Sequence, residues 1–591
     1  MSVDQLRWQR PGALAGRHFS VVVIGAGING VGVFRDLCLQ GVDCLLIDKG
    51  DVAAGASSAP SRMIHGGLRY LEHGSFSLVA EATRERNLLL RNAPHLVKPL
   101  KTVVPLSNRF GGLLSSVLRF TRLAGSPSAR GLFVVSLGLR LYDLLGRRHR
   151  VMPEHRVDPV SRHDMGLFRP DVRWAATFYD AFISHPEWLI LELLGDGCRD
   201  EQRSVVANYC KLEQGTGKTL SLRDELTGET VQLTCDVVVN ATGAWLDRCA
   251  GALDADSARV MGTKGSHLVL DHPALRRLLE GRMAYFEASD GRVCIAYPFL
   301  DQVLVGSTDI PVDDPDQAAT DPAEVGYLLG VLREMFPRLP FERKHVLYTF
   351  VGVRPLARSR ADQPGGIARD HSVAVDPPST QRQVPVVGLV GGKWTTFRAL
   401  AELATDEVLT WLRRGRRRST EPLPIGGGAH WPAHDKAKDN LVADIQAAGG
   451  LGRQRAIELL NRYGSVAVDL AERFAADGDA MLARVPGYSA AELRYLCRQT
   501  GVAHLDDLVL RRTLLAIGGR LTAEALNEMA TIAAKALGWD ARRQSAELQR
   551  CRVLLRERHG VALAEVPPTP RHAPSFDASL PARPLPTSNP T

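Results

Sequence analysis

The chain has 591 residues, of which 45% are hydrophobic and 23% charged, and its formal net charge is +8. A chain of this length is too long for one ordinary core, so two or three domains are expected. Nine cysteines are scattered without a C-x-x-C pair, which favours reduced thiols over a disulfide framework and predicts no metal site. No run of about 18 apolar residues and no secretory signal is present, so neither a membrane span nor export is expected.

The positive charge suits nucleic acid, anionic lipid or a phosphorylated substrate, and charge alone does not choose among them. No basic stripe is interleaved with aromatic residues, however. Nucleic acid is therefore not expected as a partner.

A dinucleotide motif occupies residues 21–48, which read VVVIGAGINGVGVFRDLCLQGVDCLLID. Gly25 permits a tight turn after a buried strand, Gly27 lets the backbone approach a pyrophosphate, and Gly30 lets the following helix pack against the strand. Asp48 ends the second strand, where a carboxylate can accept hydrogen bonds from a ribose. The motif predicts an adenine dinucleotide and does not distinguish NAD from FAD.

The next segments favour a flat ligand. Residues 53–76 are rich in small residues and paired glycines, a strand ends in Ala241-Thr242-Gly243, and residues 384–399 repeat the strand–glycine–helix order of the opening. A strand that delivers two glycines at a helix N-terminus can place N–H groups against an anionic edge. Residues 257–308 contain short strand-like runs typical of an antiparallel sheet.

Residues 111–150 are apolar and basic, with seven arginines between Arg119 and Arg150 and one acid, Asp143. Such a stretch is too short and interrupted to span a bilayer. It suits either an amphipathic surface beside anionic lipid or a helix with a solvated basic face.

Several further blocks give the sequence its specificity. The stretch SSAPSRMIHGGLRYLEHGSFSLVAEATRERNLL resembles the FAD-dependent (aerobic, quinone-linked) glycerol-3-phosphate dehydrogenase family. The resemblance continues through KGSH (264–267), GSTD (306–309), GVRPL (352–356), the ARD before residue 371, GGKWTT (391–396) and LVLRRT (508–513). These blocks follow the family's order over roughly residues 20–560. Trp394 stands where a smaller aliphatic residue is usual, and LVLRRT lacks a common aromatic; both put detailed packing and quinone access in question.

The resemblance implies an α/β protein with a Rossmann-like FAD-binding domain, an antiparallel-sheet substrate (cap) domain and an all-α C-terminal domain. The expected boundaries are a flexible leader at 1–17, FAD-binding segments at 18–110, 170–256 and 345–415, cap segments at 111–169 and 257–344, a helical domain at 425–565 and a disordered tail at 566–591.

The implied reaction is oxidation of sn-glycerol 3-phosphate to dihydroxyacetone phosphate, with hydride passed to FAD and electrons to a membrane quinone. The implied location is cytoplasmic, peripherally associated with the membrane, and a homodimer is left open.

The matched blocks also supply site residues. The resemblance implies His267, Arg354 and His65 as catalytic residues, with His267 as hydroxyl partner or base. It implies Arg69, Tyr70, Lys264, Arg369 and Lys393 as substrate ligands, since a phosphate dianion needs fixed cations. The expected cofactor contacts are Gly25, Gly27, Ile28, Asn29, Gly30, Asp48, Lys49, Ser57, Ser58, Ser61, His65, Gly66, Gly67, Ala241, Thr242, Gly243, Gly391, Gly392, Lys393, Trp394 and Thr395.

Three rival functions remain. The same oxidation with oxygen as acceptor is the nearest, although the extra segment that such oxidases tend to carry is not evident. An NAD-linked dehydrogenase and a non-catalytic flavoprotein with an interaction domain are the others. Bound flavin and its bleaching by substrate separate them.

Overall fold

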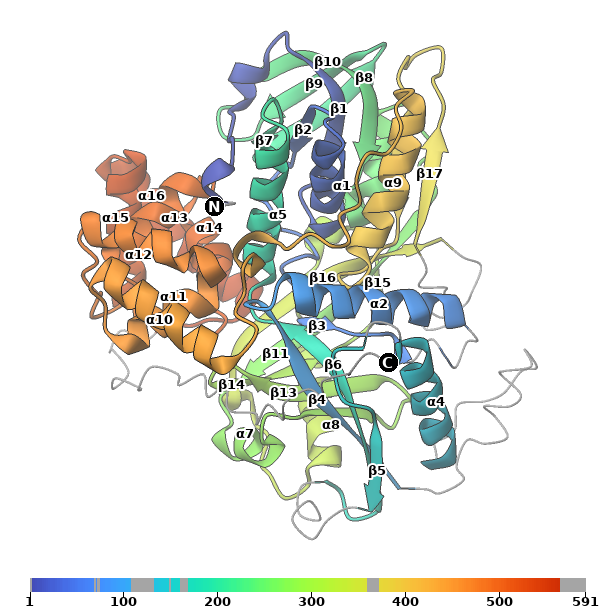
Figure 1. Cartoon of the computed structure of the whole chain (residues 1–591), viewed down its shortest axis with the longest axis vertical. Helices are drawn as coiled ribbons and strands as arrows, with labels where there is room; N and C mark the ends of the chain where they lie inside the picture. Colours follow the sequence, from blue (N-terminus) through green and yellow to red (C-terminus); the bar gives the residue numbers. More distant parts are fainter. Residues whose placement is uncertain are drawn as a thin grey trace, which may run out of the picture.

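The computed structural model describes residues 3–68, 71, 75–107, 132–147, 150–159, 168–358 and 371–563. Arg69, Tyr70 and Arg369 lie outside the described residues, as do the basic segment 108–131 and the tail from residue 564. Two sheets lie one above the other in Figure 1, and a group of helices from the last third of the chain packs at their side.

The first sheet has eight described strands, in the order β17 (Ser372–Asp376), β18 (Val386–Val390), β10 (Thr230–Asn240), β1 (His18–Ile24), β2 (Cys44–Ile47) and β7 (Val205–Ala207). In addition, β9 (Thr219–Asp224) pairs with β10, and β8 (Cys210–Thr216) pairs with β9. The strands from β18 to β7 are parallel. Their near-continuous apolar runs are buried on both faces, as parallel strands require.

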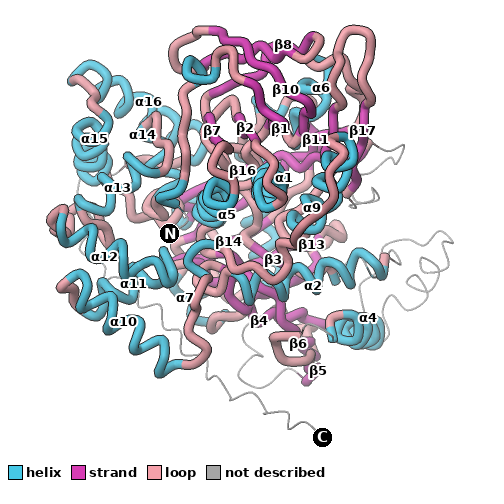
Figure 2. The backbone as a smooth tube through the Cα atoms, turned by 45° about the horizontal axis from the view of Figure 1, so that its top comes forward, coloured by secondary structure: helices cyan, strands magenta, loops and turns pink. Residues whose placement is uncertain are grey.

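Helices cover one face of this sheet. The helices α1 (Ile28–Leu39), α5 (Pro186–Asp200) and α9 (Phe397–Trp411) lie side by side there (Figures 1 and 2). Val21 and Val23 point into that layer, whereas Val22 and Ile24 point to the opposite face, where the β8–β9 hairpin packs. The helix α6 (Leu246–Ala252) lies at the end of β10.

The second sheet has ten strands, in the order β15 (Ile310–Val312), β11 (Val260–Leu270), β14 (Gln302–Gly306), β13 (Val293–Phe299), β12 (Met283–Glu287), β4 (Val97–Leu106), β6 (Trp174–Ile183) and β3 (Met63–Ile64), with β16 (Val346–Ala357) on β11 and β5 (Arg156–Pro159) on β6. All pairs are antiparallel except β12–β4. The helices α7 (Pro273–Leu279) and α8 (Pro322–Met335) cover it, and α2 (Phe76–Asn92) and α4 (Leu132–Leu145) lie at its other end (Figure 1).

The expected segment boundaries do not match sheet membership for four strands. β3, β4, β6 and β16 lie within the expected FAD-binding segments, but the structure places them in the second sheet. The reason is pairing: β16 runs antiparallel to β11 along almost its whole length, and β4 joins β6 to β12. Backbone partners, which local sequence does not show, decide sheet membership.

The helical domain comprises α10 (Asp435–Gly449), α11 (Arg453–Tyr463), α12 (Ala467–Ala476), α13 (Ala490–Gln499), α14 (Leu505–Asp507), the π-helical turn η12 (Leu508–Arg512), α15 (Ala523–Leu537) and α16 (Ala541–His559). Ser489, Thr522 and Asp540 cap helix N-termini through their side-chain oxygens. Gly538 and Gly560 end α15 and α16 in the left-handed conformation.

The leader is packed, contrary to the expectation of a flexible segment. Val3 and Leu14 are buried, and the indole N–H of Trp8 donates to the Gln499 carbonyl at 3.0 Å. Asp4 pairs with Arg473 at 2.9 Å. These apolar and charged anchors join the first residues of the chain to the helical domain.

A buried ion cluster joins the helical domain to the loop after β2. Asp51 is fully buried, and its carboxylate accepts from Arg511 Nε at 2.5 Å and from Arg512 NH1 at 2.7 Å and NH2 at 2.8 Å. Burial raises the pKa of Asp51, but the two guanidinium groups outweigh it and hold the pKa below its usual value. The LVLRRT block therefore fixes the position of residues 48–59.

Replacing Asp51 with Asn leaves the buried Arg512 guanidinium without its counter-charge, whereas Arg511 keeps Asp507 at 2.5 Å. We expect Asp51→Asn to destabilise the fold by about 3–5 kcal/mol, the usual cost of removing one partner of a buried ion pair. The measurement is the urea midpoint of unfolding. Asp439→Asn, which breaks an exposed pair with Arg453, is the control and should cost about 1 kcal/mol or less. Equal midpoints for the two variants would contradict the structural role of Asp51.

Candidate active site

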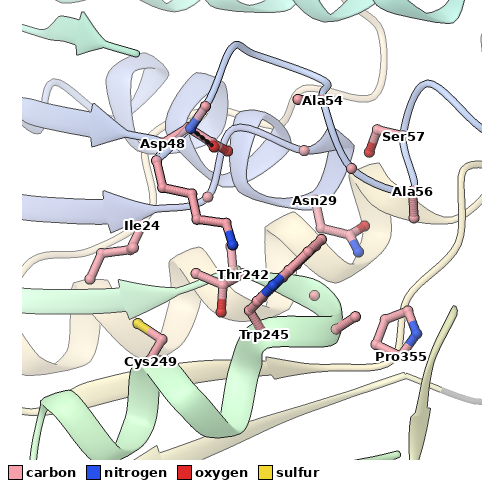
Figure 3. Close-up of a pocket in the computed structure, with 18 of the residues that line it drawn as sticks. Ile24, Asn29, Asp48, Ala54, Ala56, Ser57, Thr242, Trp245, Cys249 and Pro355 are labelled. Carbon is pink, nitrogen blue, oxygen red and sulfur yellow. Dashed lines mark hydrogen bonds between the residues drawn. The ribbon is translucent and has the colours of Figure 1, made fainter. Parts of the chain in front are cut away.

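A cavity of about 720 Å³ opens at the carboxyl ends of β1, β2 and β10. This is the edge of an open parallel sheet at which ligands bind, and the volume lies in the range of cofactor sites, about 300–1,000 Å³. Asn29 at the start of α1, Ser57 in the segment after β2, and Thr242 and Trp245 after β10 lie around it (Figure 3). The expected cofactor residues that line it are Gly25, Gly27, Ile28, Asn29, Asp48, Lys49, Ser57, Ala241, Thr242, Gly243, Gly392, Lys393 and Trp394.

The glycine-rich turn has the predicted geometry. Gly25 adopts a φ of +106°, which a residue with a side chain rarely does. A Cβ on Gly30 would overlap the Gly25 carbonyl oxygen, so Gly30 serves close packing of helix and strand. The N–H of Ile28, the first residue of α1, donates to Ser57 Oγ at 2.9 Å. The N-terminus of α1 therefore points its donors toward the cavity, as anion binding requires.

The Asp48 carboxylate closes the opposite end of the turn. It accepts the Ala26 N–H at 2.8 Å and the Gly50 N–H at 2.9 Å. Burial raises the pKa of Asp48 to about 6, and the two backbone donors act in the opposite direction. Each oxygen keeps a lone pair with which to accept a hydroxyl, so the predicted ribose contact fits this position.

The third wall comes from the GGKWTT block. Gly391 and Gly392 have φ values of +75° and +95°, so these two glycines are required for the turn. Trp394 is 9% exposed, and its indole N–H donates to the Ser57 carbonyl at 3.1 Å. The unusual tryptophan thus fixes the serine that faces the N-terminus of α1.

The residues present fit an adenine dinucleotide. The Oδ1 atom of Asn29 is buried at the cavity wall and has no hydrogen-bond partner among the described residues. Gly27 presents bare backbone at the N-terminus of α1. When a dinucleotide is bound, Asn29, Asp48 and the amides of 25–28 are the groups that would hold it.

His267 and Arg354 lie on one face of the second sheet. β11 and β16 pair His267 with Phe350, Gly265 with Gly352 and Thr263 with Arg354, so these residues share a face. Gly352 lies against residues 56–59, because a Cβ there would be 3.0 Å from the Ala59 carbonyl oxygen. His267 and Arg354 therefore lie on the sheet face that is packed against residues 56–59.

His267 is 2% exposed and neutral. Its Nε2 lies 2.7 Å from Ser61 Oγ, and its ring stacks on Phe350 with centroids 4.8 Å apart. Burial first, and then the charge of Arg354, lower its pKa to about 3. An imidazole with so low a pKa favours the neutral form, so it can share a hydrogen bond with Ser61 but binds an additional proton only weakly.

Arg354 is the more accessible of the two, with a side chain 31% exposed. Its NH1 lies 3.1 Å from Asp309 and its NH2 lies 2.9 Å from Ser307 Oγ, both in the GSTD block. The guanidinium lies over Gly265, where any Cβ would overlap it. The KGSH, GSTD and GVRPL blocks are thus parts of one site.

The expectation that Lys264 binds substrate is not supported by its position. Its side chain leaves the opposite face of β11 from Arg354, since side chains alternate along a strand. Its ammonium lies 2.8 Å from Glu324 and 3.2 Å from Asp321, and it donates to the Ala319 carbonyl at 3.0 Å. Lys264 holds the N-terminus of α8 instead.

Several expected cofactor residues lie off the cavity wall. Gly66 donates to Asp180 at 2.9 Å and to the Tyr142 hydroxyl at 3.1 Å, so it is required for packing against α4. Ser58 bonds the Gly55 carbonyl and Ser61 bonds His267. The others that do not line it are Gly30, His65, Gly67, Gly391 and Thr395.

Sequence reasoning missed Trp245, Arg248 and Asp316, which all line the cavity. Trp245 follows the Ala-Thr-Gly turn by two residues, and that proximity was the available signal. The parts of the chain built on the first and second sheets are here called the first and second domains. Asp316 lies in the second domain, between β15 and α8, and no local sequence pattern identifies it.

The fold and this cavity define an FAD-dependent oxidoreductase. A family model described as FAD dependent oxidoreductase matches residues 20–407, and one described as the C-terminal domain of alpha-glycerophosphate oxidase matches residues 418–544. The expected α/β fold with a helical C-terminal domain and the expected FAD are both confirmed.

The relatives narrow the class. A glycerol-3-phosphate dehydrogenase of Synechocystis is 31% identical over 84% of this chain and 89% of its own length, and a D-erythritol 1-phosphate dehydrogenase of Brucella abortus is 30% identical over 83% and 93%. The solved glycerol-3-phosphate dehydrogenase of Bacillus halodurans, complexed with FAD, superimposes with a TM-score of 0.70 at 20% identity and covers 92% of this chain and 96% of its own. The chain belongs to the glycerol-3-phosphate dehydrogenase family.

We expect Gly27→Val to abolish FAD retention without unfolding the protein. A Cβ at Gly27 would already lie 3.1 Å from Ser57 Oγ, so the two further methyl groups must enter the cavity. The measurement is the ratio of flavin to protein absorbance after purification. Gly12→Val, where a Cβ meets nothing within 4 Å, is the matched control. Full flavin occupancy in the Gly27 variant would refute this placement of the cofactor.

Proposed function

We propose that this protein oxidises sn-glycerol 3-phosphate to dihydroxyacetone phosphate. The observation that carries the proposal is the placement of Arg354 beside His267, on the sheet face against the cofactor loop, in a chain of this family. Arg354 supplies a fixed planar set of donors for a phosphate dianion. In this structure Arg354 contacts Asp309 and Ser307. A phosphate dianion, as a stronger anionic ligand, can replace these two contacts.

Bound FAD supplies the hydride acceptor for the C2 hydrogen. The protein's part is to bind the phosphate, orient the C2 hydroxyl and accept its hydrogen bond. The low pKa of His267 supports the role of hydroxyl partner, through Ser61, over that of a resident base. Arg69, Tyr70, Arg369 and Lys393 remain proposed substrate ligands, and His65 a proposed second catalytic histidine.

The second candidate substrate is a longer polyol phosphate. The Brucella relative is named for D-erythritol 1-phosphate and is nearly as similar as the glycerol-3-phosphate dehydrogenases. Both compounds present a phosphate and a secondary hydroxyl, so the cation set alone does not separate them.

The proposed electron acceptor is a membrane quinone, with the protein bound peripherally on the cytoplasmic face. The support is α4, on which Phe133, Leu137 and Leu144 are 55%, 51% and 62% exposed along one side, together with Arg140. An apolar strip beside cations suits an anionic lipid surface. Among the described residues, no helix has the length and apolarity to cross a membrane.

Anaerobic mixing of the purified protein with glycerol 3-phosphate should bleach the flavin absorbance, and D-erythritol 1-phosphate should do so more slowly.

Arg354→Ala should lower kcat/KM for glycerol 3-phosphate about 10- to 100-fold, since the phosphate loses a charged hydrogen-bond donor. Arg358→Ala, which removes an exposed arginine just past β16, is the control and should keep the wild-type kcat/KM.

In the mixing experiment, flavin left unbleached by glycerol 3-phosphate would refute the reaction, and faster bleaching by D-erythritol 1-phosphate would reassign the substrate. Reoxidation of the bleached protein by oxygen faster than by a short-chain quinone would favour the oxidase.

The double variant Phe133→Glu/Leu137→Glu should bind anionic phospholipid vesicles at least about tenfold more weakly, because two apolar side chains no longer leave water. Vesicle sedimentation measures it. Leu403→Glu, at an equally exposed leucine on α9, is the control. Anaerobic bleaching by glycerol 3-phosphate should be unchanged in both variants. Equal vesicle binding by all three proteins would remove α4 from the membrane surface.

A further inference from the structure

A short segment of the second domain lies across the mouth of the dinucleotide cavity. Residues 314–321, here called the strap, connect β15 to α8 and contain the single turn η7 (Pro315–Gln317). Asp316 of the strap lines the cavity together with Lys49, Trp245 and Arg248 of the first domain. Trp245 rises from the segment after β10 into the cavity (Figure 3), and its ring lies next to Gly55 of the loop after β2.

The Asp316 carboxylate gathers three first-domain side chains. Its Oδ1 lies 2.8 Å from Lys49 Nζ and accepts the Trp245 indole N–H at 3.0 Å, and its Oδ2 lies 3.0 Å from Arg248 NH1. The Lys49 ammonium also lies 4.5 Å from the centre of the Trp245 ring. The other terminal nitrogen of Arg248, NH2, lies 2.9 Å from Asp314 Oδ1. One strap carboxylate therefore holds an indole and two cations at the cavity mouth.

Two further anchors hold the backbone of the strap. Arg558, near the end of α16, donates to the Ala318 carbonyl at 2.7 Å and to the Asp316 carbonyl at 3.1 Å. Lys264 donates to the Ala319 carbonyl at 3.0 Å. The strap is thus held by the first domain, by the helical domain and by β11 of its own domain. These contacts explain the position of Lys264 and give α16 a role in the cofactor site.

The strap also borders a second cavity of about 300 Å³, which is lined by Pro315, Asp316, Ala318 and Arg558 together with residues 54–56. None of residues 314–321 is buried, so the position of the strap depends on the polar and charged contacts just described.

We propose that the strap retains FAD, with Asp316 as a positioning residue that keeps Trp245, Lys49 and Arg248 closed over the dinucleotide. Release of the cofactor then requires these contacts to break together. Lys49, Asp316 and Arg248 are each about half exposed, with side-chain exposures of 43%, 44% and 51%. Their interactions are consequently screened by salt, and the retention they provide should weaken with ionic strength.

The test measures release of FAD from the purified holoenzyme, followed as the rise of free-flavin fluorescence after dilution at low and high sodium chloride. It needs no substrate, so it is independent of the proposed reaction. Asp316→Ala should speed release about fivefold at low salt, the effect of losing exposed ion pairs worth about 1 kcal/mol together. High salt should bring the wild type toward the Asp316→Ala rate while changing that variant little. Arg558→Met should give a smaller increase.

Asp290→Ala is the matched control, because Asp290 is a 40% exposed acid that pairs with Arg292 and accepts from the Tyr327 hydroxyl away from the cavity. Its release rate should equal that of the wild type. Asp316→Asn keeps the size and the carbonyl oxygen for Trp245 but loses the charge, and it should release FAD at an intermediate rate. An Asp316→Ala rate equal to that of the wild type would overturn the proposal. A slower rate would also overturn it, since Asp316 would then only compete with the pyrophosphate for Lys49 and Arg248.

Discussion

The Asp51 carboxylate between Arg511 and Arg512 is the interaction on which the rest of the structure depends. Asp51 stands three residues past Asp48, and the loop that it fixes carries Ser57, which bonds the N-terminus of α1, and Ser61, which bonds His267. Displacement of either the carboxylate or the guanidinium groups would leave a buried charge without its partner, which is strongly destabilising. The helical domain thus helps to position the cofactor loop, although none of its described residues lines the cavity.

The cofactor half of the site was predictable from sequence, because its residues are local. Gly25, Gly30 and Asp48 fall in one run of strand, helix and strand, and the predicted roles of turn, packing and ribose contact all fit the structure. Thirteen of the predicted contacts lie on the cavity wall; six belong to this run or directly follow it, and the other seven come from glycine-rich or family-matched blocks after β2, β10 and β18.

The substrate half was predictable only in part. Lys264 and His267 stand three residues apart in one motif, and alternation along β11 sends them to opposite faces. A family block identifies such residues but does not say which way each one points. Asp316 and Arg558 could not be found at all, because Asp316 meets Lys49 across 267 residues and Arg558 meets the strap across 240. Strand membership fails similarly: β16 belongs to the second sheet through its partner β11, and a partner is not visible in the strand's own sequence.

The parallel order of the first sheet has a consequence for synthesis on the ribosome. β1 needs β10, and β10 needs β18, so the central strands wait until about residue 390 has emerged before the sheet is complete. Trp8 waits longer still, for Gln499. Pairings so distant in sequence are slow to form and leave apolar strand edges exposed meanwhile. A nascent chain of this protein therefore exposes the edge of β10 until β18, which ends at Val390, has been synthesised.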